Sequence, residues 1–240
     1  MNNLNLTEKN RKIIDTFVEE IKQAYQNNLV SLILYGSAAK GEFIDANSDF
    51  NILVVLNNDS LFNLKKASVI VNKLNYTRVC PIFMNEECIQ KSLGVFPMQF
   101  LDMKDHYSLL FGKDLLKDAN IDTVNLEFQC ILELNLKLIN LKQQYLKIDQ
   151  RDKVVLGELL FKNFTSVICI LRNLVRLKNN APLPLTEDIL RETAIELQIG
   201  ITVFLKVLAA KRDPITLTAA DIDSLLMEFT NELEKITKRN

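Results

Sequence analysis

The residues of this chain best suited to bind a phosphate lie in one segment, residues 34–56 (LYGSAAKGEFIDANSDFNILVVL). Gly36 has no Cβ, so its backbone can approach a phosphate closely. Ser37 offers a hydroxyl and an N–H at the start of a predicted short helix, where the helix dipole favours anions. Lys40 in the same turn is a candidate phosphate contact, and an ordinary solvated lysine is the more common alternative. We interpret this turn as a phosphate-binding site.

A candidate metal ligand follows the turn. Gly41 allows the chain to reverse direction, and Ser48-Asp49 opens the next apolar run. Asp49 is a hard oxygen ligand, the type that Mg²⁺ prefers, and it would hold the ion against the same phosphates. The alternative is a glycine turn followed by a serine-capped strand, with no ligand at all.

The elements around this segment predict an α/β half. Residues 29–35 and 50–56 are short apolar runs that predict two buried strands. We expect these two strands to form a hairpin or to be close neighbours in the sheet. Residues 78–84 predict a third strand, in which Pro81 favours an edge position or a bulge. Thr7 is a plausible N-cap for an amphipathic helix over 7–27. The other expected elements of this half are a helix over 61–74 and an extended segment over 97–103.

Beyond residue 118 the pattern becomes helical. We therefore predict an N-terminal α/β domain over 1–118 and an all-helical domain over 119–240. Residues 154–177 are apolar on nearly all sides, as in the central helix of a bundle. The other expected helices cover 122–148, the stretch from Thr186, 199–211 and 219–238. On the first of these, one stripe is expected to face the core: Phe128, Ile131, Leu132, Leu138, Ile139, Tyr145 and Leu146.

Composition excludes several classes of function. Twenty-nine basic against 30 acidic residues give a net charge of −1, which is not the basic footprint of a general nucleic-acid binder. The single histidine, His106, excludes a histidine-rich metal centre. No uninterrupted apolar run reaches the roughly 18 to 20 residues of a membrane span, and the N-terminus is polar. We expect a soluble cytoplasmic protein with no membrane partner, and homo-oligomerisation stays open.

The four cysteines, Cys80, Cys88, Cys130 and Cys169, lie far apart in the sequence. No pair has the spacing of a metal knuckle, and the chain lacks a dense disulfide framework. We expect them to be reduced, buried packing residues.

The pattern Gly36-Ser37, Gly41 and Ser48-Asp49 resembles the nucleotidyltransferase superfamily typified by DNA polymerase β. Residues 96–114 are similar to the end of the catalytic domain in bacterial nucleotidyltransferase-like proteins with a helical C-terminal domain. The aminoglycoside nucleotidyltransferases share this plan. The resemblance implies a polymerase-β-like domain with a mixed sheet, followed by a helical bundle.

The resemblance also implies an activity. A nucleoside monophosphate would pass from an Mg²⁺-bound nucleoside triphosphate to a hydroxyl acceptor of unknown identity. Gly36, Ser37, Lys40 and Asp49 would bind the nucleotide, and Asp49 with residue 51 would bind the metal ion.

This chain departs from the family pattern at its carboxylates. Active relatives place two acids two residues apart on one strand and a third on a neighbouring strand, to hold two metal ions. Here the second position is Asn51, and the predicted third strand (RVCPIFM) contains no acid. Asp102 is the candidate substitute, so the expected catalytic set is Asp49, Asn51 and Asp102. Activity is then weak, or the chain is an inactive relative that binds a nucleotide or a protein partner. Arg78 is either a triphosphate clamp or an ordinary strand-end arginine.

Overall fold

The computed structural model describes residues 6–41, 43, 49–74, 78–179, 185–196, 198–213 and 217–239. The chain divides into two compact units, Met1–Asp122 and Thr123–Asn240. The division lies a few residues beyond 118, because Leu115, Leu116 and Ala119 are buried in a core cluster of the first unit.

The first unit is built on a four-stranded mixed sheet with the order β3-β2-β1-β4. β1 pairs with β2 and with β4 in antiparallel fashion, while β2 and β3 run parallel. The expected antiparallel neighbours and the edge position of the strand containing Pro81 are therefore confirmed. The strand bounds are β1 Leu29–Tyr35, β2 Phe50–Leu56, β3 Val79–Met84 and β4 Tyr107–Gly112.

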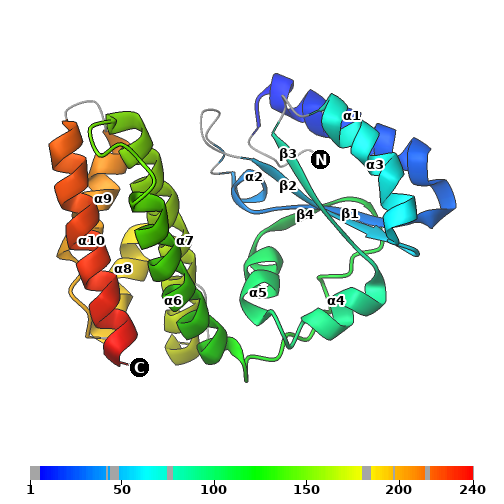
Figure 1. The fold of residues 1–240 in the computed structure, drawn as a ribbon. Coiled ribbons are helices and arrows are strands. Elements are labelled where there is room, and N and C mark those ends of the chain that lie inside the picture. The colour runs from blue at the N-terminus through cyan, green and yellow to red at the C-terminus, as the bar shows by residue number, and fades with distance from the viewer. Residues whose placement is uncertain are drawn as a thin grey trace. The chain divides into compact units, whose positions relative to one another are not determined.

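Helices cover both faces of this sheet (Figure 1). Side chains alternate along a strand, so Ile52 and Val54 of β2 pack in the cluster that includes α1 and α3. Leu53 and Val55 pack on the opposite face, in the cluster that includes α4 and α5. The helix bounds are α1 Glu8–Tyr25, α3 Leu61–Lys73, α4 Glu86–Ser92 and α5 Pro97–Asp105, and a 3₁₀ turn, η1, covers Gln26–Asn28.

Sequence signals at the first helix were sufficient to place it. The side chain of Thr7 caps α1 by accepting a hydrogen bond from the backbone N–H of Asn10 at 3.3 Å. Ile14, Phe17 and Ile21 recur at helical spacing and are buried against the sheet. The cap and the apolar face therefore act as predicted.

The segment 97–103 was wrongly expected to be extended. It lies in the helix α5, which begins with Pro97 in its first turn, where a missing N–H costs nothing. Phe100 and Met103, three residues apart, are buried in the core cluster of one sheet face. The extended strand of this region is β4, which follows the helix and was not predicted.

The second unit is all-helical in its described residues. α7 lies at its centre and contacts α6, α8, α9 and α10, as its all-round apolar pattern predicted. By length and composition alone, Lys153–Lys178 would also suit a membrane span, with a mean hydropathy of 1.8. Such a helix is weak evidence for a span, because 56% of its most apolar window is buried within the protein. The bounds are α6 Leu126–Tyr145, α7 Lys153–Asn179, α8 Thr186–Glu196, α9 Thr202–Arg212 and α10 Ala219–Arg239.

The buried face of α6 differs from the expected stripe. Phe128 and Ile139 are 70% and 53% exposed, whereas Cys130 and Leu134 are buried. Leu132 and Leu146 of the expected stripe are also exposed. The helix carries apolar residues on two faces, and periodicity alone cannot choose which one packs against α7 and α10.

Candidate functional site

The turn after β1 is closed by two glycines in conformations that other residues rarely adopt. Gly36 has φ 76° and ψ −151°, and Gly41 has φ 77° and ψ 15°. Between them lies the short helix α2 (Ser37–Lys40), whose Ala39 and Lys40 N–H groups both donate to the carbonyl oxygen of Gly36 at 3.1 Å. Four residues sum few peptide dipoles, so α2 attracts anions less through its dipole than the sequence suggested.

The turn lies against the start of β2. Tyr35 and Asn51 are Cα partners in the antiparallel pairing of β1 and β2. A Cβ atom built on Gly36 would lie 3.1 Å from Nδ2 of Asn51. Asp49 is exposed and directly precedes β2, two residues before Asn51. The structure thus brings Gly36 and Asn51 together at one end of the sheet, and Asp49 directly precedes the strand that carries Asn51.

Lys40 and Ser37, two expected nucleotide contacts, lie in the described turn, whereas Ser48 of the family motif does not. Lys40 is half-buried and its backbone N–H helps to close the turn. Ser48 lies outside the described residues. Ser37 stands at the first position of α2, directly after Gly36, and is half-buried.

A row of four partnered residues crosses the sheet beside this turn. Tyr107 pairs with Tyr35, Tyr35 with Asn51, and Asn51 with Cys80. Registered partners share one face of a sheet, so Cys80 of the edge strand β3 flanks Asn51. Sequence reasoning missed Cys80, and its expected burial is wrong: Cys80 and Cys88 are exposed, while Cys130 is buried and Cys169 is half-buried. All four thiols are free.

The pKa values of Tyr35 and Cys80 in this row are both raised. Burial raises the pKa of Tyr35 to about 12, and the neighbouring Cys80 adds to the shift. Burial also raises the pKa of the Cys80 thiol, and the negative charge of Asp49 adds to that increase. Tyr35 therefore remains a neutral hydroxyl at ordinary pH, and Asp49 lies near enough to Cys80 for its charge to act on the thiol.

The side chains at this place do not fit a pair of Mg²⁺ ions. Mg²⁺ takes oxygen ligands, and two such ions need several carboxylates. Asp49 is the carboxylate of the expected strand pair, Asn51 is a neutral amide, and Cys80 is a thiol. Across the described residues, no three His, Cys, Asp or Glu side chains gather as a metal site.

The two remaining candidates have specific positions. Asp102 lies on the helix α5 and not on a strand, and it is half-buried. Its proposed contribution to a metal site stays a prediction. The guanidinium of Arg78 lies over the ring of Phe43, 5.8 Å from the centroid, and that ring stacks on Phe50 at 4.4 Å. This cation–π contact gives Arg78 a packing role at the entry to β3.

A comparison with protein families finds a match within this unit. Residues 14–102 match the family model of the nucleotidyltransferase domain, a segment that spans the glycine turn, Asp49 and Cys80. This stretch of the first unit is similar to nucleotidyltransferase domains. The expected polymerase-β-like fold, with a mixed sheet and a helical remainder, is confirmed.

A solved structure resembles the whole chain. The crystal structure of spectinomycin adenyltransferase AAD(9) from Enterococcus faecialis, with ATP and spectinomycin, matches 93% of this chain and 99% of its own. The TM-score is 0.63 and the sequence identity is 11%, so the likeness is one of fold. Among curated proteins, none is similar enough in sequence to count as a relative. The likeness extends over both compact units of this chain, since it covers 93% of its residues.

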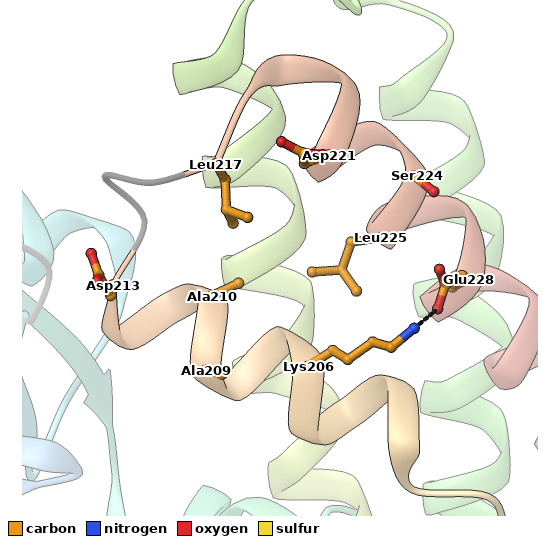
Figure 2. A pocket seen from close by; sticks show the side chains of 9 residues that line it. All are labelled: Lys206, Ala209, Ala210, Asp213, Leu217, Asp221, Ser224, Leu225 and Glu228. Carbon is orange, nitrogen blue, oxygen red and sulfur yellow. Dashed lines mark hydrogen bonds and ion pairs between the residues drawn. The ribbon is translucent and has the colours of Figure 1, made fainter.

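The helical unit contains a separate open pocket between α9 and α10, with a volume of about 580 Å³ (Figure 2). Lys206 in its wall donates to Glu228 at 2.7 Å. Asp221 accepts from the N–H and the hydroxyl of Thr218 and so caps α10. Most of the charged groups in the wall therefore already have partners within the protein. The pocket is lined by Lys206, Ala209, Ala210, Asp213, Leu217, Asp221, Ser224, Leu225 and Glu228.

Proposed function

We propose that the nucleotidyltransferase domain binds a nucleoside triphosphate at the glycine turn, and that the protein transfers a nucleoside monophosphate to a hydroxyl acceptor. The observation that carries this proposal is the close approach of Gly36 to Asn51, where a Cβ atom on Gly36 would lie 3.1 Å from Nδ2, inside the segment that matches the family. It places a Cβ-free turn beside the polar start of β2.

The proposed contacts follow from the local geometry. The first N–H groups of a helix have no partner within it, so those of Ser37 and Ala38, with the Ser37 hydroxyl, are the donors for phosphate oxygens. Lys40 adds a positive charge at the far end of α2. Asp49 is the acidic residue directly before β2, and we assign it the orientation of the triphosphate through a cation.

A second candidate function is nucleotide binding without turnover. Asn51 occupies the position where active relatives carry a second carboxylate. The residues of β3 that share its face, Cys80, Ile82 and Met84, are not acids. Losing one transition-state interaction of several kcal/mol lowers a rate by about 10²-fold or more. This observation favours a slow enzyme or a binding protein.

Calorimetric titration with ATP, GTP, CTP and UTP, with and without a divalent cation, tests the binding step. We expect cation-dependent binding of at least one nucleotide in the native protein. Asp49→Ala should abolish the cation dependence, whereas Asp118→Ala, which removes an exposed carboxylate of the same unit, should leave it unchanged. No binding of any triphosphate by the native protein would contradict the proposal.

Pyrophosphate release separates the two candidate functions. Spectinomycin is the first acceptor to test, because the similar structure was solved with ATP and spectinomycin. Release that requires an acceptor, and that is lost in Asp49→Ala, would support transfer. Binding without release across a panel of hydroxyl acceptors would support the second function.

A further inference from the structure

The helix α6 carries a row of exposed apolar side chains, which we call the outer row: Phe128, Leu132, Ile139 and Leu146. They are 70%, 45%, 53% and 80% exposed, and Leu136 at the edge of the row is 44% exposed. Steps of four and seven residues place the outer row along one side of the helix. The buried residues of α6 lie on the opposite side, so the core does not account for the outer row.

The outer row is apolar and nearly free of charge. Asn135 and Gln143 are the neutral polar residues on the same side of the helix, and Asn135 donates to the carbonyl oxygen of Ile131 at 2.8 Å. Lys142, the charged residue of α6 closest to the row by helical position, is paired with Glu234 of α10 at 2.5 Å. Anionic lipids and nucleic acids are bound through clustered lysine and arginine. The outer row therefore suits another apolar protein surface better than either of these.

The exposed area of the outer row is large enough for an interface between two copies of the chain. At roughly 150 to 200 Å² for each large apolar side chain, the exposed parts of this row and of Leu136 amount to about 500 Å². Two copies would bury about 1,000 Å² before any flanking residue is counted, which is about the lower limit for a specific interface. Apolar patches of several hundred Å² on a soluble protein often mark an interaction site.

We propose that the protein forms a two-fold symmetric homodimer in which the outer rows of two α6 helices pack in antiparallel orientation. Leu132 and Ile139 are equally far from the midpoint between residues 135 and 136. A two-fold axis through that midpoint sets Leu132 of each copy against Ile139 of the other. Phe128 of one copy then fills the space between Ile139 and Leu146 of the second copy, as a knob fills a hole in a coiled coil. This inference uses no residue of the nucleotide site and does not depend on the proposed function.

Sedimentation velocity of the full chain tests the dimer. Over about a hundredfold range of protein concentration, the native protein should shift with mass action to twice the 27.5 kDa of one chain. Ile139→Glu should keep the protein monomeric, because it buries a carboxylate in an apolar contact twice in each dimer. The matched control is Met227→Glu, which places the same charge on α10 of the same unit, at a side chain that is 50% exposed. This control should remain dimeric.

Mixing two monomeric variants tests the antiparallel register. Leu132→Lys alone should also prevent association. A mixture of Leu132→Lys and Ile139→Glu should recover dimers, because one contact then joins a lysine to a glutamate and the other keeps its native leucine and isoleucine. A parallel pair of helices would set position 132 against position 132 and would give no recovery. Circular dichroism should show native helix content in both variants, since both side chains are exposed in the single chain.

Several results would overturn the proposal. The first is a native protein that is monomeric at every concentration, and the second is a dimer that survives Ile139→Glu. Failure of the mixture to recover dimers would reject the antiparallel register. A monomer that sediments with vesicles of phosphatidylcholine and phosphatidylserine would assign the outer row to a lipid surface. A monomer that Ile139→Glu destabilises towards urea would assign the row to a contact within one chain.

Discussion

Gly36 and Asn51 are in contact range across the first two strands of the sheet: a Cβ atom on Gly36 would lie 3.1 Å from Nδ2 of Asn51. The backbone of Gly36, with φ 76° and ψ −151°, falls in a region that is essentially restricted to glycine. Glycine is therefore required at position 36 for two reasons: its backbone conformation, and the lack of space for a Cβ atom beside Asn51. This is the position where we propose that the triphosphate binds.

Gly36→Ala should destabilise the protein by about 1 to 3 kcal/mol and abolish nucleotide binding, since the turn must leave its conformation. The control is Gly94→Ala, because a Cβ on Gly94 meets nothing within 4 Å. Urea denaturation of both variants measures the difference in stability. Equal stability of the two variants would show that the turn is not constrained as described.

Tyr35→Phe should flatten the decline of stability at alkaline pH. The folded-state pKa of Tyr35 is about 12, whereas an unfolded tyrosine titrates near about 10. Between these values the folded state holds the proton and the unfolded state releases it, so the free energy of unfolding falls as pH rises. The contribution of Tyr35 is present below about pH 10, amounts to roughly 2 to 3 kcal/mol, and is lost by about pH 12.

Denaturant unfolding at intervals from pH 9 to pH 12, roughly the range set by the two pKa values, measures this effect. Parallel curves for the native protein and Tyr35→Phe would contradict the burial of the Tyr35 hydroxyl.

Asn51→Asp should raise the affinity for Mg²⁺ with ATP by about tenfold, since it adds a second carboxylate two residues after Asp49. Asn72→Asp introduces the same charge on the exposed surface of α3 and should have no such effect. Calorimetry with Mg²⁺ and ATP compares the two. A similar gain in both variants would point to net charge and not to a repaired site.

Two leucines of α6 distinguish its faces. Leu134 is 1% exposed and Leu136 is 44% exposed. Leu134→Ala should lower the free energy of unfolding by about 2 to 5 kcal/mol, because it leaves a cavity in the core. Leu136→Ala should change it by less than about 1 kcal/mol. Thermal or urea unfolding of both proteins checks this prediction. A larger loss of stability in Leu136→Ala than in Leu134→Ala would show that the face of α6 that carries Leu136 is the buried one.

The sequence was sufficient where one local signal determined one structure. The Thr7 cap and the apolar spacing of Ile14, Phe17 and Ile21 define α1, and Pro81 correctly predicted an edge strand. The α6 stripe failed because both faces of that helix are apolar, and only contacts with α7 and α10 decide which face is buried. Residues 97–103 were expected to be extended but form the helix α5. The strand β4 that follows this helix was therefore not predicted.

Within the candidate site, the glycine turn and Asp49 could be read from residue types and spacing. Cys80 could not, because its place beside Asn51 depends on the register of two parallel strands separated by a helix. The remaining signal was indirect: the predicted third strand lacked an acid where relatives carry one.

Alkylation of Cys80 in the presence of ATP tests the central claim most directly, that the glycine turn, Asp49 and the flanking strand form one nucleotide site. Cys80 and Cys88 are both exposed, so mass spectrometry can follow the rates of both thiols in one sample. With Mg²⁺ present throughout, ATP should slow the modification of Cys80 by at least about tenfold, as expected for a thiol covered by a bound ligand, and leave the rate at Cys88 unchanged. Equal rates at Cys80 with and without saturating ATP would contradict the account.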